Sequence, residues 1–163
     1  MNWISEYLEL VESVSADQVF VALNQLAQRN AGAIIFTCST FDSVTQQAMR
    51  IYTNQPGEYP VSGLKNVVEN RWTRHVLDQG QTFVANETGG FADVFPDYEL
   101  INSLGCHSVV NMPIIISGKV LGTVNLLHEA GYYTPERVQQ VSEMKSAAML
   151  AFLITANSSF QER

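Results

Sequence analysis

The chain has 163 residues and a formal net charge of −7, with 46% hydrophobic and 15% charged residues. This length fits one domain of ordinary size, and such a chain buries about two-thirds of its unfolded surface when it folds. The high hydrophobic fraction excludes a disordered chain, which combines low hydrophobicity with high net charge. The acidic charge repels phosphate backbones, so we expect no nucleic-acid partner.

The sequence shows no export or membrane signal. Its start, Met1 to Glu6, lacks the basic residues and the apolar run of a signal peptide. The longest apolar stretches, such as residues 147–154, are far shorter than the roughly 20 residues of a membrane span. The two cysteines lie far apart in the sequence, which fits a reducing compartment. We therefore expect a cytoplasmic protein that does not bind membranes.

The first segment, residues 1–30, is predicted to be helical. Ile4, Leu8 and Val11 recur at helical spacing, and a second apolar stripe follows Ser15. An Asn-Ala-Gly run then ends the segment. These stripes predict two helices, or one bent helix.

A sheet with covering segments is expected over residues 31–130. Short apolar runs rich in strand-forming residues predict five strands, at residues 33–39, 45–53, 81–86, 106–116 and 119–128. The run at 45–53 has a composition that also suits a helix, but its Ile-Tyr-Thr end, followed by Asn, Pro and Gly, favours a strand. Between the strands we expect an irregular connection over 54–66, a helix over 70–79, a loop over 91–96 and a short helix capped by Asp97.

The last predicted element is a long helix over residues 134–157. Thr134 is a typical N-cap, Pro135 suits the first helical position, and Glu136 lies near the positive end of the helix dipole. Strands and helices do not alternate regularly, which disfavours a doubly wound parallel sheet. We expect an α+β architecture with one antiparallel sheet, terminal helices on one face, and loops and short helices over the other.

Three local patterns resemble the GAF domain family. The run Ser103 to Ile114 is similar to the family's penultimate strand, and the run Gly118 to Leu126 is similar to the turn and strand that follow. Tyr133 to Glu136, which opens the last helix, is also typical of the family. The resemblance covers nearly the whole chain, so residues 1–163 are identified as a single GAF-like domain, related to the profilin and PAS folds. It implies an antiparallel sheet of five or six strands in the order 2-1-5-4-3.

The resemblance also implies a function. GAF domains commonly bind small molecules in a pocket on the face away from the terminal helices, and they frequently dimerise through those helices. The broad apolar ridge of residues 4–14 and 138–155 agrees with a homodimer. We expect a sensor or regulatory domain that acts through dimerisation or a partner protein, with no catalytic residue and no metal.

The ligand itself is not predicted. The Asn-Lys-Phe-Asp-Glu signature of cyclic-nucleotide-binding GAF domains is missing from the sequence, and so is the cysteine setting of bilin-binding members. The resemblance therefore implies an unidentified small molecule and leaves the cofactor unknown.

Several residues are candidates for the ligand site. Phe95 and Asp93 lie in a segment that we interpret as a lid, with an apolar contact and a charged acceptor; the alternative is a turn whose Phe anchors a loop to the core. Trp72, which has basic residues nearby, is predicted to line the pocket. Tyr52 is a similar candidate. Each of these two aromatic residues has a core position as its alternative.

A two-residue turn at Ser117-Gly118 sets the predicted register of the last two strands. Counting outward from it pairs His107 with His128, either as half of a metal or haem site or as two histidines bonded to backbone and water. In this register Asn111 and Asn125 face opposite sides of the sheet, so at most one of them sees the pocket. Asn111 is the predicted ligand-binding residue, and the alternative is an amide that ties a strand to a helix end.

Cys38 and Cys106 are expected on strands that this fold places near one another, with Cys38 at the pocket. An alternative function is therefore a GAF-type thiol redox enzyme such as a free methionine sulfoxide reductase, which needs a thiolate and a resolving cysteine within reach. That family usually has three characteristic cysteines, whereas this chain has two. A second alternative is a dimerisation or scaffold module without a ligand, which a filled interior would favour.

Overall fold

The computed structural model describes residues 3–161, with the side chains of residues 4–156. Residues 1, 2, 162 and 163 of the predicted domain lie outside this range. The N-terminal segment forms two helices, α1 (Trp3–Ser13) and α2 (Val19–Asn30), joined by a 3-10 turn at Ala16–Gln18. Both helices are amphipathic as predicted, because Tyr7 of α1 and Leu23 of α2 are fully buried.

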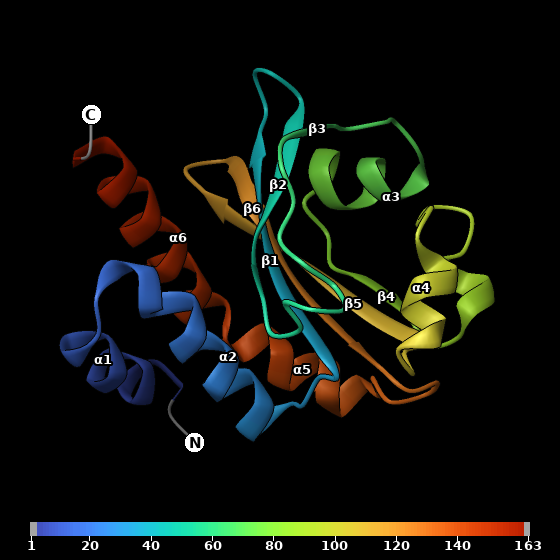
Figure 1. Cartoon of the computed structure of the whole chain (residues 1–163), viewed down its shortest axis with the longest axis horizontal. Coiled ribbons are helices and arrows are strands. Elements are labelled where there is room, and N and C mark those ends of the chain that lie inside the picture. The colour runs from blue at the N-terminus through green and yellow to red at the C-terminus, as the bar shows by residue number, and fades with distance from the viewer. Residues whose placement is uncertain (1–2, 162–163) are drawn as a thin grey trace.

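Six antiparallel strands form one sheet (Figure 1). They are β1 (Ile35–Asp42), β2 (Gln47–Thr53), β3 (Lys65–Asn66), β4 (Phe83–Ala85), β5 (Ser108–Ile116) and β6 (Lys119–His128). Their order in the sheet is β3-β2-β1-β6-β5-β4. Without the short β3 at the edge, this is the predicted order 2-1-5-4-3, so the α+β architecture is confirmed. The ambiguous run at 45–53 is a strand, as predicted.

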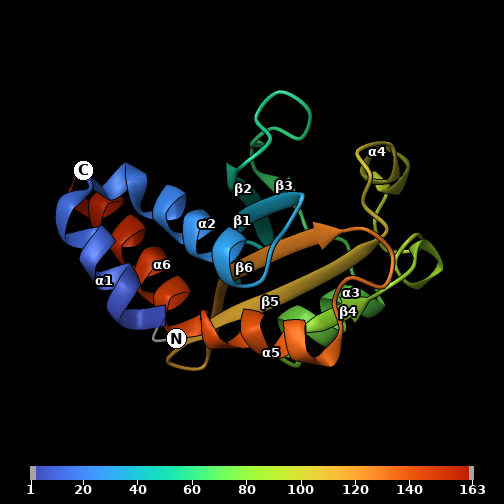
Figure 2. The same ribbon diagram turned by 90° about the horizontal axis from the view of Figure 1, so that it is seen from below.

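Helices cover the two faces of the sheet differently (Figures 1 and 2). α1, α2 and α6 (Lys145–Gln161) gather on one side, and α3 (Arg71–Thr73) and α4 (Tyr98–Ser103) lie on the other. A π-helical turn, Arg74–Asp78, extends α3, and Gly80, with a φ of 65°, follows its C-cap Gln79. None of the helices between residues 3 and 161 is both long enough and apolar enough to cross a membrane.

The predicted helix over residues 134–157 begins where expected but is divided into two. Thr134 Oγ1 accepts a hydrogen bond from the backbone N–H of Arg137 at 3.3 Å. α5 (Pro135–Glu143) ends before Met144, and α6 begins directly after it. Met144 and Ala148 are both fully buried. Because a sheet twists, one straight helix of this length would leave its surface, and the break keeps the apolar sides of both helices against it.

Alternate residues of each strand point to opposite faces and form two separate hydrophobic clusters. On what we call the helical face, Phe36 of β1 and Leu126 of β6 pack with α2 and α6. On the opposite face, Ile35 of β1 and Leu127 of β6 pack under segments that we call the cover. The cover consists of residues 54–66, 70–79 and 88–98, and we call this side of the sheet the cover face.

One extra residue in β6 shifts the predicted register of the last two strands. Ile116 pairs with Lys119 across the turn, as expected, but Ile114 pairs with Gly122. Leu121 is therefore a β-bulge, and every pair beyond it is displaced by one residue.

The shift separates the two histidines that the sequence pairs. Ser108, not His107, faces His128, so the predicted histidine pair is wrong. Nδ1 of His107 lies 3.2 Å from Thr88 Oγ1. The ring of His128 stacks on the ring of Tyr132, with the ring centroids 3.5 Å apart. Among the residues that the structure describes, no three metal-ligating side chains gather into a group.

Gly122 lies directly after this bulge, where β6 approaches its neighbours closely. A Cβ atom at Gly122 would lie 2.1 Å from the backbone oxygen of Ser39 and 2.5 Å from the ring of Phe152. Only glycine permits this approach of β6 to its neighbours. An isolated glycine inside a strand pattern signals a bulge or a close backbone contact, and that signal is present in the sequence.

A second bulge lies in β2, at Ile51. Cys38 pairs with Tyr52, but the next residue of β1, Ser39, pairs with Arg50. The extra residue turns Tyr52 to the helical face and Arg50 to the cover face. In a regular strand residues 50 and 52 would face the same side, so the bulge separates them and Arg50 alone of the two lines the space under the cover.

Candidate functional site

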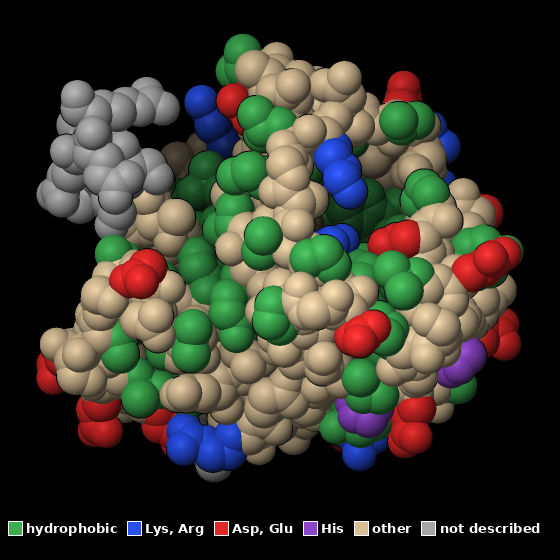
Figure 3. Space-filling model, in the orientation of Figure 1, with side chains coloured by type: hydrophobic (Ala, Val, Ile, Leu, Met, Phe, Trp, Pro, Cys, Tyr) green, Lys and Arg blue, Asp and Glu red, His purple; other side chains and the backbone are tan. Residues whose placement is uncertain are grey.

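A cavity of about 400 Å³ lies between the sheet and the cover. Polar side chains of the central strands form its floor: Thr37, Ser39, Asn111, Thr123 and Asn125. Aromatic and aliphatic side chains of the cover lie over it: Tyr59, Trp72, Leu77, Phe95 and Pro96. Three charged residues also line it: Arg50, Lys65 and Asp97. In Figure 3 the surface is hollowed beside Lys and Arg side chains, with hydrophobic side chains in the depth of the hollow. This volume is at the lower end of the range of about 300–1,000 Å³ for small-molecule sites.

A row of hydrogen-bonded side chains, which we call the polar row, crosses the floor of the cavity. Trp72 Nε1 donates to Asn111 Oδ1 at 2.9 Å. Asn111 Nδ2 donates to Asn125 Oδ1 at 2.7 Å, and Asn125 Nδ2 donates to Thr37 Oγ1 at 3.1 Å. The last three residues are buried and are direct cross-strand partners on β5, β6 and β1. Each amide nitrogen carries two protons and uses one of them in the row, so the other can serve a ligand.

The polar row exists because of the bulge at Leu121. The predicted register places Asn111 and Asn125 on opposite faces of the sheet, and the structure shows that this prediction is wrong. A one-residue shift moves every side chain beyond it to the other face. Both amides therefore lie under the cover and satisfy each other, in place of tying a strand to a helix end.

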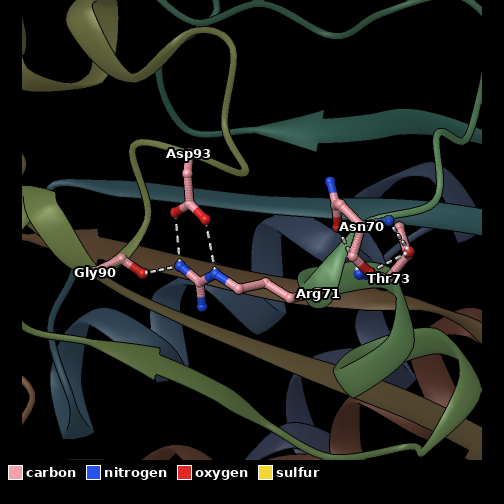
Figure 4. A network of polar contacts seen from close by, with 5 residues as sticks. All are labelled: Asn70, Arg71, Thr73, Gly90 and Asp93. Atoms are coloured by element: carbon pink, nitrogen blue, oxygen red, sulfur yellow. Dashed lines mark hydrogen bonds and ion pairs between the residues drawn. The ribbon is translucent and has the colours of Figure 1, made fainter.

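An ion pair between Arg71 and Asp93 ties two parts of the cover together (Figure 4). Arg71 Nε and Nη2 donate to the two Asp93 oxygens at 2.9 and 2.7 Å, and Nη2 also donates to the Gly90 oxygen at 2.6 Å. Asn70 and Thr73 cap α3 by reciprocal side-chain bonds to each other's backbone N–H. The hydrogen bonds from Arg71 lower the pKa of Asp93. Asp93 does not line the cavity, and its carboxylate holds the loop.

Tyr59 links the charged residues at the edge of the cavity. Its hydroxyl donates to Asp97 Oδ2 at 2.8 Å, and the Arg50 guanidinium carbon lies 3.9 Å from its ring centroid. Burial, with the charge of Asp97, raises the pKa of Tyr59, so the hydroxyl stays protonated and donates. Asp97 occupies the predicted N-cap position of α4, but its side chain makes no capping hydrogen bond. The carboxylate bonds to Tyr59 instead.

Three of the six predicted ligand-binding residues line the cavity: Trp72, Phe95 and Asn111. The rings of Trp72 and Phe95 meet edge to face with centroids 6.3 Å apart. Phe95 also packs on Phe91, with centroids 5.5 Å apart. Phe95 thus both covers the cavity and anchors its loop to the core. The lid and the anchored turn, which the sequence offers as alternatives, are therefore both features of this one residue.

Tyr52 and Cys38 lie on the helical face, away from the cavity. The Tyr52 ring stacks on Phe20 at 6.4 Å and meets Phe36 edge-on at 6.0 Å between centroids. Cys38 is fully buried in the same cluster. The bulge at Ile51 turns Tyr52 to this side, and the alternation of β1 places Cys38 there too.

The two cysteines belong to different clusters on opposite faces of the sheet, Cys38 on the helical face and Cys106 under the cover. Burial raises the pKa of the Cys38 thiol well above its usual value and raises that of Cys106 to about 11. Neither thiol lines the cavity. A reactive thiolate and a resolving thiol must reach each other, and this arrangement lends thiol chemistry no support.

Most residues that line the cavity are absent from the predicted set, among them Thr37, Arg50, Lys65 and Asn125. Gly122 signals the bulge that brings Asn125 into the site. Lys65 lies in a two-residue strand without a hydrophobic pattern. Nothing in the sequence of β2 signals the bulge that turns Arg50 under the cover.

The chain is an α+β domain of a recognisable class. Its antiparallel sheet has terminal helices on one face and a cavity of ligand size on the other. The sequence profile of the GAF domain matches residues 7–153, which is most of the chain. The chain therefore belongs to the GAF domain family, as its strand order and local patterns indicate. No curated protein shows significant similarity to the sequence.

Solved GAF-fold structures share this architecture at low identity. The GAF domain of a two-component sensor histidine kinase from Bacillus halodurans has a TM-score of 0.72 and 12% identity, covering 93% of this chain and 100% of that chain. The phycocyanobilin-bound GAF domain of a cyanobacterial phytochrome has a TM-score of 0.69 and 11% identity, covering 96% and 95%. A type II free methionine-R-sulfoxide reductase from Thermoplasma acidophilum has a TM-score of 0.62 and 10% identity, covering 87% and 92%. These similarities show the fold, and GAF domains are commonly small-molecule-binding sensor domains.

Proposed function

We propose that this protein is a cytoplasmic sensor or regulatory domain that binds a small molecule between the sheet and the cover. The polar row carries the proposal, because it sets donors and acceptors in fixed positions on the floor of a cavity roofed by apolar side chains. Ligand sites share this combination of apolar walls and a few placed polar groups. A scaffold module without a ligand would have a filled interior, and the cavity argues against that alternative.

The sheet offers a direct route from the cavity to the terminal helices. Asn125 of β6 faces the cavity, and its neighbour Val124 packs in the cluster with α2 and α6. A ligand that favours one arrangement of the polar row and of the cover also favours the matching position of the strands. It thereby shifts the population of helix positions on the opposite face.

We further propose that the signal passes through a homodimer formed by the terminal helices. α1 and α6 lie side by side (Figure 2), with Leu8 44% and Leu153 47% exposed. Each of these neighbouring helices thus presents a large apolar side chain to solvent, which a second copy of the chain would cover. Wild-type protein should sediment as a dimer, and the double variant Leu8→Glu, Leu153→Glu as a monomer with an unchanged fold. A monomeric wild type at high micromolar concentration would disprove the dimer.

Ligand retention tests the proposed function. Native mass spectrometry of protein purified from its own host should show a bound small molecule. Trp72→Ala and Phe95→Ala should each weaken its binding by at least about tenfold, because each removes a large apolar contact. Leu100→Ala is the matched control, since Leu100 is exposed on α4 and does not line the cavity. Unchanged affinity in both aromatic variants would rule out this cavity as the binding site.

A further inference from the structure

The edge of the cavity carries a charge opposite to that of the whole chain. The chain has a net charge of −7, but two cations, Arg50 and Lys65, and one anion, Asp97, line the cavity. A cleft lined by one predominant sign concentrates ligands of the opposite sign. The cavity of this acidic protein therefore attracts an anion.

Arg50 is held in place but lacks a carboxylate partner. Arg29, Arg71 and Arg74 each form an ion pair, whereas Arg50 and Lys65 form none within residues 4–156. Arg50 Nη1 donates to the backbone oxygen of Pro60 at 2.9 Å, and the guanidinium lies on the Tyr59 ring. These contacts fix the orientation of the guanidinium and leave other N–H groups of its planar fork for a ligand. Arg50 is thus a preorganised anion-binding group.

Asp97 limits the charge of the anion. Its carboxylate is fixed by the Tyr59 hydroxyl, and Tyr59 also carries the Arg50 guanidinium on its ring. A dianion such as a phosphate monoester would meet this fixed negative charge close to its own second charge. A carboxylate carries one charge and fits the guanidinium fork with two parallel hydrogen bonds.

The rest of the cavity suits a compact apolar body. The side chains of Phe41, Trp72, Leu77 and Phe95 line it together with the polar row. Its volume of about 400 Å³ suits a small ligand of one or two rings.

We propose that the ligand is a small aryl or alkyl carboxylate whose carboxylate binds Arg50 and Lys65 and whose apolar body lies between Trp72, Phe95 and the polar row. This inference rests on the proposed function and adds the chemical class of the ligand. Arg50, which lies on the Tyr59 ring, sets the negative sign of the ligand charge. Asp97, which accepts a hydrogen bond from Tyr59, limits that charge to one.

Three probes of nearly the same shape test the charge. Phenylacetate carries one charge, phenylacetamide carries none, and phenyl phosphate carries close to two at neutral pH. The indole N–H resonance of Trp72, assigned with a Trp72→Phe variant, reports occupancy because this group bonds to Asn111 on the cavity floor. Phenylacetate should shift it saturably, at a concentration at least about tenfold lower than phenylacetamide requires. Phenyl phosphate should bind more weakly than phenylacetate.

Two variants test the residues. Arg50→Gln should reduce the affinity for phenylacetate by about tenfold, to the level of the amide, and Lys65→Gln by a smaller factor. Lys65 is exposed, so Lys65→Gln remains a valid test if Arg50→Gln unfolds. Arg74→Gln, which removes an exposed arginine paired with Glu69 outside the cavity, should change nothing.

Four outcomes would each overturn the carboxylate class. Two concern the probes: phenylacetamide binds as tightly as phenylacetate, or phenyl phosphate binds more tightly. The others are that neither Arg50→Gln nor Lys65→Gln changes the affinity for phenylacetate, or that no probe shifts the Trp72 resonance. A neutral or cationic ligand found in protein from its own host, and weakened by Trp72→Ala, would also overturn it while leaving the sensor function intact. The two proposals therefore fail separately.

Discussion

The helical face and the cover face are built from alternate residues of the same strands, yet they are closed in different ways. On the helical face the side chains of the strands meet α2 and α6 closely, and Ala148 and Ala151 of α6 are fully buried. On the cover face, the corresponding positions carry polar side chains under a cover of loops and short helices, and a cavity remains. Close packing stabilises one face, and the other face is packed less completely and keeps a cavity.

Two phenylalanines of β1 provide the largest expected difference between the faces. Phe36 is fully buried on the helical face, and Phe41 lines the cavity and is partly exposed. Phe36→Ala should lower the free energy of unfolding by about 3–5 kcal/mol, because it leaves a void in a close-packed cluster. Phe41→Ala should lower it by about 1 kcal/mol or less. Chemical denaturation of both variants measures the difference, and equal losses would contradict the contrast between the faces.

Asn125 tests whether the polar row supports the cover face. Asn125→Ala leaves Asn111 Nδ2 and Thr37 Oγ1 without their partner in a buried position. We expect the free energy of unfolding to fall by about 1–3 kcal/mol, the usual cost of a buried polar group without a bond. Asn66→Ala on the exposed strand β3 is the control and should stay within about 0.5 kcal/mol of wild type. A loss no larger than that of the control would show that the row is not structurally important.

The ion pair of Asp93 with Arg71 should matter for local motion and not for global stability. Asp93→Asn weakens the bonds that hold the loop. The backbone N–H groups of Val94 and Phe95 bond to the Phe91 oxygen. In the variant we expect these two N–H groups to exchange with deuterium several times faster than in wild type. Both charged groups are exposed, so the global unfolding transition should remain the same. Glu69→Gln, which breaks another exposed ion pair, should leave this exchange unchanged. Loop protection equal to wild type in Asp93→Asn would show that other contacts hold the cover.

His128 should give the smallest effect, at the end of the sheet where the chain leaves for α5. Burial lowers the pKa of His128, and its Nδ1 accepts a hydrogen bond from the N–H of Glu129 at 2.8 Å. The unfolded chain therefore binds a proton more readily than the folded one, so stability should decrease as the pH falls through about 6.5. Unfolding free energies at pH 7.5 and 5.5 should differ less in His128→Gln than in wild type. An equal pH dependence in both proteins would assign it to other groups.

The sequence by itself determined most of the architecture. Apolar periodicity locates the terminal helices, the strand-rich runs locate five of the six strands, and the Thr134-Pro135 cap marks the start of α5. These signals are local, because a helix or a strand must present its apolar residues at its own spacing to be buried. The resemblance to GAF domains, carried by ordered local patterns, then predicts the strand order.

Only the tertiary structure decided which side chains meet at the cavity. A single extra residue at Leu121 brings Asn125 beside Asn111, and another at Ile51 places Tyr52 and Arg50 on opposite faces, with Arg50 under the cover. A strand pattern repeats every two residues, so one bulge reverses every later assignment to a face. Gly122 marks one bulge in the sequence, but the faces that result depend on contacts between distant segments, such as the approach of Ser39 to Gly122, and local sequence patterns do not contain those contacts.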